Sequence, residues 1–476
     1  MRRSILLAVL SAALVVGLTA TSCGGGRGGN KNPITDLDAS GRFDGGGDDG
    51  GLPDGGRPDA SFPLPKAEDW TFYGTANGGP IVVKGVSADQ GGNLWVAGAE
   101  EGLFLLRPDS DTFERFTMDD GLRPYGYPRA NQGTITKKYL NVLSVAGGPA
   151  GTVFVGYAGM PPGPSEYGCE DNWDGPNPDP NIYKSGDADK VTLAGDGIRV
   201  VHYDISSGEG VVAGEPRGRE KVCDVYRILY DPRTSSLWFG GNHAYAWGDP
   251  SYAGNPTCFG QLGCSGVMEH AHPLLNGYNR EADASPSALT NYYYGLAIEP
   301  SGELWIGGMF RSQHCASGNR GSGFWTCESQ ALSPSAHIDW WPDAVQSYSR
   351  PSGRTDDLVS DMDVGADGSL WISSFTNGIA HRLPGGGVDF ISGGLVDPLH
   401  AYSIEVDPLD GSVWVGAGQG GLTRIKGGQF IAYGVSVFGA RLALGHVPDI
   451  QVDTSGGRRR ILVAFQAGAI GVYEGD

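Results

Sequence analysis

Residues 402–433 read YSIEVDPLDGSVWVGAGQGGLTRIKGGQFIAY and contain four short segments in which apolar and polar residues alternate. Turns that contain glycine or proline separate these segments. A period of two is typical of β-strands, and glycine and proline are typical of the turns between them. The segments that we predict as strands are residues 402–407, 412–417, 422–426 and 429–433. This stretch therefore predicts one four-stranded unit.

The second strand of this unit carries a motif that recurs along the chain: a turn residue, an apolar residue, an aromatic residue, an apolar residue and a small residue. The copies are NLWVA at 93–97, TVFVG at 152–156, SLWFG at 236–240, ELWIG at 303–307, SLWIS at 369–373, SVWVG at 412–416 and a degenerate RILVA at 460–464. The shortest spacing, from Trp371 to Trp414, is close to the ~40–45 residues of one propeller blade. We therefore predict that residues 67–476 form an all-β, seven-bladed β-propeller with loop insertions in blades two to four.

The last blade lacks one strand, because the chain stops soon after residues 469–473. Residues 70–73, WTFY, precede the first blade and resemble the outer strands of other units. We expect them to complete the last blade and so remove an exposed sheet edge. The recurring tryptophans are predicted to fill the space between neighbouring blades, and the small residue after them to allow close approach.

These units resemble the two-component-regulator propeller repeat, in which an Asp-Gly-Leu motif precedes the inner strand and Gly-x-Leu-Trp-Ile-Gly-Thr follows it. The first motif is matched at residues 120–122, 356–358 and 393–395, and the seven copies above match the second. Propellers of that family are extracytoplasmic ligand sensors joined to histidine kinases. No kinase follows here, so the resemblance implies a stand-alone ligand-sensing propeller.

The N-terminus has the order of a secretory signal: Arg2 and Arg3, an apolar run over residues 5–18, and small residues up to Cys23. Residues 18–23, LTATSC, resemble a bacterial lipobox, although Ala20 stands where the family prefers leucine. We expect a signal peptide at 1–22 and a lipidated Cys23. Residues 23–66 are rich in Gly, Asp and Pro and are predicted to form a flexible tether. Gly24 after the cysteine resembles an outer-membrane sorting signal, so we expect a cell-envelope lipoprotein facing the periplasm or the exterior.

Six cysteines remain after Cys23, and an even set in an exported chain favours disulfides. The predicted pairs are Cys169–Cys223, Cys258–Cys264 and Cys315–Cys327. All six are assigned to loop insertions on one face of the propeller, and we expect this stapled face to bind the ligand.

The same insertions are rich in aromatic residues beside polar ones, which suits recognition of a sugar or a peptide. The candidate ligand-binding residues are Tyr167, Trp173, Trp247, Tyr252, Tyr278, Tyr292 and Trp325. The alternative is that such rings form small cores beneath the loops.

The sequence favours a binding protein for a glycan, a peptide or a partner protein. The alternative is a propeller enzyme, of the lyase or glycan-cleaving type, with acids, bases or metal ligands converging at the axis. No catalytic, cofactor or metal motif is predicted. The net charge of −20 disfavours a nucleic-acid partner, and the run 458–460 of three arginines is predicted to be a solvated turn. We expect a monomer that touches the membrane only through its lipid.

Overall fold

The computed structural model describes residues 62–124, 140–158, 187–203, 205, 210–212, 215–217, 224–241, 245–255, 266–271, 293–308, 312–315, 337–338, 340–341 and 357–475. All of them lie in one of the two compact units of the chain, Gly51–Asp476. The predicted signal peptide and lipidated cysteine, and the tether up to residue 61, lie outside these residues.

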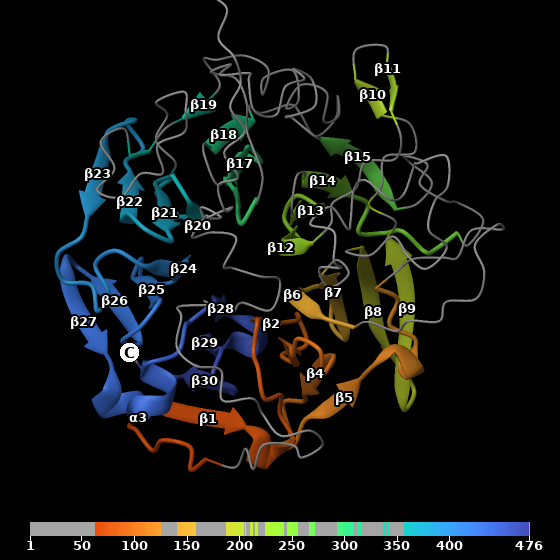
Figure 1. Ribbon diagram of the computed structural model, residues 1–476, viewed down its shortest axis with the longest axis horizontal. Helices are drawn as coiled ribbons and strands as arrows, with labels where there is room; N and C mark the ends of the chain where they lie inside the picture. Colours follow the sequence, from red (N-terminus) through yellow and green to blue (C-terminus); the bar gives the residue numbers. More distant parts are fainter. Residues whose placement is uncertain are drawn as a thin grey trace, which may run out of the picture. The chain divides into compact units, whose positions relative to one another are not determined.

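The described unit consists of four-stranded antiparallel sheets, most of them built from four consecutive strands (Figure 1). The first sheets are β2(Gly85–Ala88)–β3(Leu94–Ala97)–β4(Leu103–Leu106)–β5(Glu114–Phe116), β6(Val142–Gly147)–β7(Thr152–Tyr157)–β8(Ala188–Ala194)–β9(Gly197–Tyr203), β12(Val225–Asp231)–β13(Ser236–Gly241)–β14(Tyr245–Gly248)–β15(Val267–Ala271) and β16(Gly295–Ile298)–β17(Leu304–Gly307)–β18(Ser312–Cys315)–β19(His337–Ile338). The remaining ones are β20(Val359–Val364)–β21(Leu370–Ser374)–β22(Gly378–Arg382)–β23(Val388–Ile391), β24(Ala401–Val406)–β25(Val413–Ala417)–β26(Leu422–Lys426)–β27(Gln429–Tyr433) and β28(Asp449–Asp453)–β29(Arg460–Phe465)–β30(Ala469–Tyr473)–β1(Trp70–Gly74).

A small hairpin, β10(Gly210–Val212)–β11(Glu215–Arg217), and the helix α3(Val435–Ala443) lie in connections between sheets. Short 3-10 turns span Thr75–Asn77, Met118–Asp120 and Ser455–Gly457. In the part of the chain that the structure describes, no helix has the length and apolarity that a membrane crossing requires.

The strands labelled β2, β6, β12, β20, β24 and β28 lie toward the centre of a ring, and β1 lies on its rim (Figure 1). We call these central strands, together with β16 of the remaining sheet, the inner strands. These inner strands contact one another in the order β2, β6, β12, β16, β20, β24, β28 and back to β2. The prediction of an all-β propeller is therefore confirmed. The predicted closing strand is confirmed as well, because β1 pairs with β30 from Trp70 opposite Tyr473 to Gly74 opposite Ala469.

The recurring motif has the packing role that its composition predicts. Trp95, Trp305 and Trp414 are at most 1 % exposed, and each packs against the next sheet of the ring. The small residue after the motif's second apolar position is needed for close approach. A Cβ on Gly416 would stand 2.7 Å from a methyl carbon of Val447, and one on Gly240 would stand 2.5 Å from the carbonyl of Tyr293.

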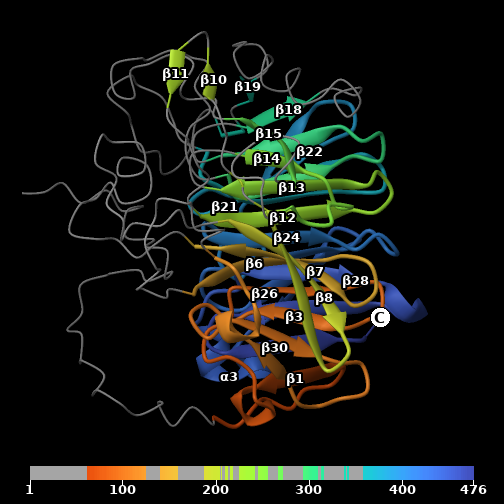
Figure 2. The same cartoon turned by 90° about the vertical axis from the view of Figure 1, so that its right-hand side faces the viewer.

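The two ends of the strands form two faces, seen edge-on in Figure 2. We call the face where the inner strands begin the connection face, because the chain passes there from sheet to sheet. We call the opposite face the turn face, since the inner strand turns there into the second strand.

The expectation that the loop insertions of blades two to four all leave from one face is wrong. The third strands β14 and β18 run in the same direction as the inner strands, and they end at the turn face. The segments that carry Cys258, Cys264 and Cys327 therefore start from the turn face, whereas those with Cys169 and Cys223 start from the connection face.

Candidate functional site

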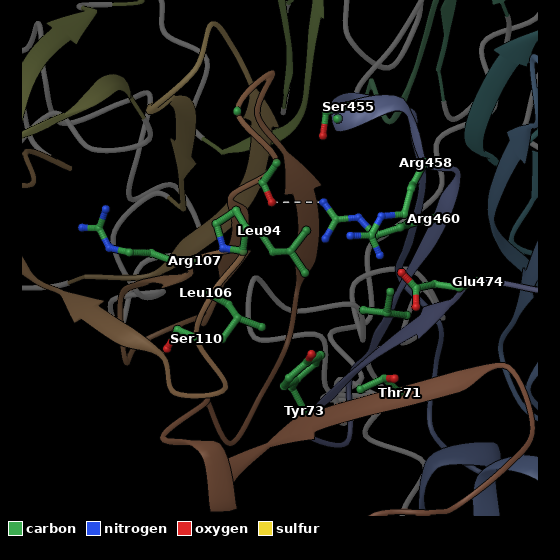
Figure 3. A pocket seen from close by; sticks show the side chains of 15 residues that line it. Thr71, Tyr73, Leu94, Leu106, Arg107, Ser110, Ser455, Arg458, Arg460 and Glu474 are labelled. Atoms are coloured by element: carbon green, nitrogen blue, oxygen red, sulfur yellow. Dashed lines mark hydrogen bonds between the residues drawn. The ribbon is translucent and has the colours of Figure 1, made fainter.

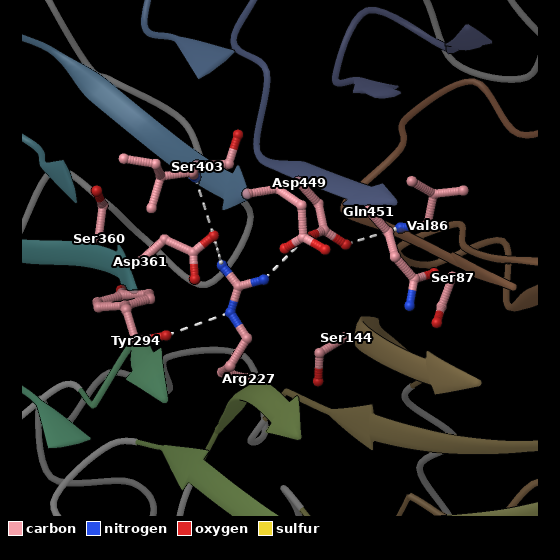
Figure 4. A network of polar contacts seen from close by, with 12 residues as sticks. Val86, Ser87, Ser144, Arg227, Tyr294, Ser360, Asp361, Ser403, Asp449 and Gln451 are labelled. Carbon is pink, nitrogen blue, oxygen red and sulfur yellow. Dashed lines mark hydrogen bonds and ion pairs between the residues drawn. The ribbon is translucent and has the colours of Figure 1, made fainter. Parts of the chain in front are cut away.

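Polar side chains of the inner strands β20, β24 and β28 join their sheets to the next ones around the axis (Figure 4). The pattern is a side-chain oxygen that accepts a hydrogen bond from a backbone N–H of the following inner strand. The pairs are Asp361 with Ile404 at 3.2 Å, Asp363 with Val406 at 2.7 Å, Glu405 with Val452 at 3.1 Å, Asp449 with Val86 at 2.9 Å and Gln451 with Ala88 at 2.6 Å. Inner strands are sheet edges with N–H groups that lack a strand partner, and these side chains satisfy them.

Arg227, on β12, extends this network across the axis. Its Nη1 donates to Asp449 at 2.8 Å, its Nη2 lies 3.1 Å from Asp361, and its Nε donates to the carbonyl of Tyr294 at 3.2 Å. The side chains of Arg227, Asp361 and Asp449 are only 19, 7 and 12 % exposed. One arginine thereby links four sheets, with all three of its side-chain nitrogens engaged.

Burial changes the protonation of these carboxyls. It raises the pKa of Asp361 to about 7 despite the opposing charge of Arg227, and it raises the pKa of Asp363 to about 6. The pKa of Glu405 is raised well above its ordinary value, first by burial and then by the charge of Asp363. The axis therefore holds carboxyl groups that take up protons near neutral pH.

The stability of the propeller is expected to rise as the pH falls from 8 to 6. Asp361 has a higher pKa in the folded than in the unfolded chain, so its contribution is complete below its ordinary pKa and is lost as the pH rises through about 7. Protonation of Asp361 alone should raise the free energy of unfolding by about 1–2 kcal/mol between pH 8 and pH 6. Urea unfolding at both pH values measures the change, and Asp361→Asn should reduce it; an unchanged pH dependence in the variant would contradict this assignment.

Aromatic rings flank the network at the connection face, in what we call the aromatic arc. Its members are Tyr226, Tyr294, Phe375, Tyr402 and His446, which come from β12, β24 and the segments next to β16, β21 and β28. Neighbouring rings lie 4.4, 5.1, 4.9 and 4.6 Å apart in that order. Four of the rings are half-buried, and Tyr402 is 8 % exposed. Half-exposed aromatic rings beside polar groups suit contact with a sugar face or a peptide side chain.

Two of the predicted ligand-binding residues can be placed. Trp247, on β14, is half-buried and stacks on Trp238 at 6.1 Å between the sheets. Tyr252 is half-buried against Tyr203, and its hydroxyl accepts from the backbone N–H of Asn255 at 2.7 Å. Tyr167, Trp173, Tyr278, Tyr292 and Trp325 lie outside the described residues.

The predicted disulfides stay predictions. Cys23, Cys169, Cys223, Cys258, Cys264 and Cys327 lie outside the described residues. Cys315 ends β18, where only its backbone is described.

The turn face has a cavity of about 250 Å³ between the sheet β28–β29–β30–β1 and the sheet β2–β5 (Figure 3). Arg458 and Arg460 line it, so the arginine run borders a cavity. The prediction of a solvated turn holds for the exposed Arg458. Arg460 donates to Asp453 at 2.8 Å and to the carbonyl of Gly92 at 3.0 Å, and Arg459 donates to Asp407 at 3.1 Å. These two arginines tie neighbouring sheets together.

The fold and the axial site define an all-β propeller with an aromatic and polar surface on its connection face. No family model matches the chain, and this includes the two-component-regulator propeller repeat. No curated protein matches it either.

Solved structures are similar to it at low identity. One, titled "Crystal Structure of Mitotic Checkpoint Complex", is 12 % identical, with a TM-score of 0.49, and the match covers 89 % of this chain and 96 % of that one. Another, titled "YCF48 bound to D1 peptide", is 13 % identical, with a TM-score of 0.46, and the match covers 87 % and 100 %.

Proposed function

We propose that this chain is an extracytoplasmic binding propeller of seven blades that holds a peptide or glycan ligand, or a segment of a partner protein, at the aromatic arc. The proposed blade number is supported by the four-stranded sheet that belongs to each inner strand of the ring. The ligand would contact the arc directly, and the loop insertions that leave from the connection face would extend the contact surface.

One observation carries this proposal. Four of the five rings of the arc are partly exposed, while the ionic groups beside them already serve the fold. Arg227, Asp361 and Asp449 each hydrogen-bond to backbone or to one another. A general acid or base needs a proton-carrying atom within reach of the substrate. The arc supplies contact area for binding, whereas the charged groups of the network are occupied in joining sheets.

The test is capture from peptide and glycan libraries by the full chain. We expect a retained ligand, and we expect Phe375→Ala to lose it. Retention by that variant at the same strength would place the binding surface elsewhere.

We also propose that Cys23 carries a lipid that anchors the protein to the cell envelope, because the residues before it resemble a lipobox. Cys23→Ser is expected to move the protein from the membrane fraction to the soluble exported fraction. Cell fractionation measures this shift, with a Ser22→Ala variant as the matched control that should remain in the membrane. Membrane association of Cys23→Ser equal to that of the parent would contradict the anchor.

A further inference from the structure

Three metal-ligating side chains meet at the turn face, at the edge of the sheet β16–β19. Glu299, Glu303 and His314 each present one ligand atom, and these atoms lie within 4.8 Å of one another. The Nε2 of His314 is 3.5 Å from an oxygen of Glu299 and 3.9 Å from an oxygen of Glu303. That nitrogen is buried and makes no hydrogen bond, although it faces both carboxylates.

The fold fixes this grouping. The turn between β16 and β17 is closed by hydrogen bonds from the N–H of Glu299 to the carbonyl of Glu303 and from Gly302 to Glu299, both at 2.8 Å. Gly302 has a φ of 91°, which favours glycine. On β18, His314 pairs with Trp305, and the two rings stack at 4.0 Å. Both carboxylates and the imidazole are therefore held by the sheet.

Part of this arrangement serves the fold. Glu299 accepts from the indole N–H of Trp305 at 2.7 Å, as Asp89 does from Trp95 at 2.9 Å. The ring stack also recurs in the sheet β20–β23, where His381 lies 3.8 Å from Trp371 and its Nε2 likewise has no hydrogen-bond partner.

The two sheets differ in what faces the imidazole. The turn before β21 has the same hydrogen bonds as the turn before β17, from Gly365 to Ser369 and from Gly368 to Gly365. Gly365 and Ser369 therefore stand where the other sheet has Glu299 and Glu303. The stack alone is a structural feature. Aspartates also lie near His381, namely Asp367 and Asp389, but among the described residues only the sheet β16–β19 brings two carboxylates within ligand distance of the imidazole.

We propose that Glu299, Glu303 and His314 bind a divalent transition-metal ion of the Zn²⁺ type. A tetrahedral ion with ligand bonds of about 2.0–2.2 Å places its ligand atoms about 3.3–3.6 Å apart. The 3.5 Å from His314 to Glu299 agrees with this spacing, and the 3.9 Å from His314 to Glu303 exceeds it by a few tenths of an ångström. One imidazole and two carboxylates suit such an ion, while Ca²⁺ takes oxygen ligands. Three protein ligands leave one position open for water or another ligand.

The test is titration calorimetry of the full chain with Zn²⁺, using three single variants. His314→Phe keeps the ring stack but removes the nitrogen, and Glu303→Gln removes one carboxylate. His381→Phe is the matched control, because it makes the same change in the sheet β20–β23, where Gly365 and Ser369 stand at the positions of Glu299 and Glu303. We expect one Zn²⁺ per chain and more than about 100-fold weaker binding in the first two variants, with unchanged binding in His381→Phe. A thermal melt of each variant shows that it is folded.

Three outcomes would overturn the proposal: no Zn²⁺ binding by the parent chain, equal binding in Glu303→Gln, or equal loss of binding in His381→Phe. If His314→Phe does not melt cooperatively, Glu303→Gln decides, since its change is isosteric and its side chain is partly exposed. None of these outcomes depends on ligand capture at the aromatic arc, which lies on the opposite face.

Discussion

Replacing Arg227 with methionine is expected to lower the free energy of unfolding by about 3–5 kcal/mol. The guanidinium joins Asp361 and Asp449 across the axis, and both carboxyls are almost fully buried. Without the arginine, the two buried carboxylates either stay charged and repel each other with no compensating charge, or they take up protons and become neutral. Either route costs stability, because the charge of Arg227 is what lowers the pKa of both groups against the effect of burial.

Equilibrium unfolding in urea measures this effect, and Arg107→Met is the matched control. Arg107 also pairs with a carboxylate, Glu114, but their side chains are 39 and 41 % exposed. An exposed pair contributes less than about 1 kcal/mol. Adding Asp361→Asn to Arg227→Met should recover part of the loss. If Arg227→Met lowers the free energy of unfolding by no more than Arg107→Met does, the axial ion pairs do not hold the sheets together.

The fold could be predicted from the sequence because its signal is local and repeated. The motif around Trp95, Trp305 and Trp414 places an aromatic residue on a central strand, and the turns beside it contain glycine. These features depend on period and turn chemistry within a few residues. The closing strand could be predicted by counting the strands of the last unit.

The axial site could not be predicted in this way. Arg227 stands alone in the strand VYRILY, and its partners Asp361 and Asp449 are more than a hundred residues away. The rings of the aromatic arc come from five separate segments, so no spacing connects them. The sequence gives a weak indication of acidic side chains at the axis. Asp361 and Asp363 alternate with apolar residues on a strand that is predicted to be an inner strand.

The faces of the insertions were assigned wrongly because the third strands of two sheets are short and atypical. β14 is YAWG and β18 is SQHC, and neither shows clear alternation. The long segments around them could therefore be placed before or after the third strand. Pairing of Trp238 with Trp247 and of Trp305 with His314 fixes the third strands, and so shows that the segments carrying Cys258, Cys264 and Cys327 follow them.

The aromatic arc is expected to carry much of the ligand affinity, with Phe375 at its centre. Its ring lies 5.1 Å from Tyr294 and 4.9 Å from Tyr402, and it is half-buried. Aromatic side chains at the centre of an interface commonly contribute about 2 kcal/mol or more, which is about thirtyfold in affinity. Phe375→Ala should therefore weaken the captured ligand by about thirtyfold or more.

Phe390 provides the matched control for that substitution. It is a phenylalanine on the outer strand β23, is 54 % exposed and takes no part in the arc. Phe390→Ala removes the same ring from the same sheet, so loss of affinity specific to the Phe375 variant reports on the arc. A cooperative melt of both variants shows that the propeller stays closed.

The most direct measurement is the dissociation constant of the captured ligand for the parent chain, Phe375→Ala and Phe390→Ala, determined by calorimetry at one pH and salt concentration. If the ligand binds at the aromatic arc, the dissociation constant of Phe375→Ala should be higher than that of the parent chain by about thirtyfold or more. The dissociation constant of Phe390→Ala should equal that of the parent chain. Equal constants for all three proteins would contradict binding at the aromatic arc.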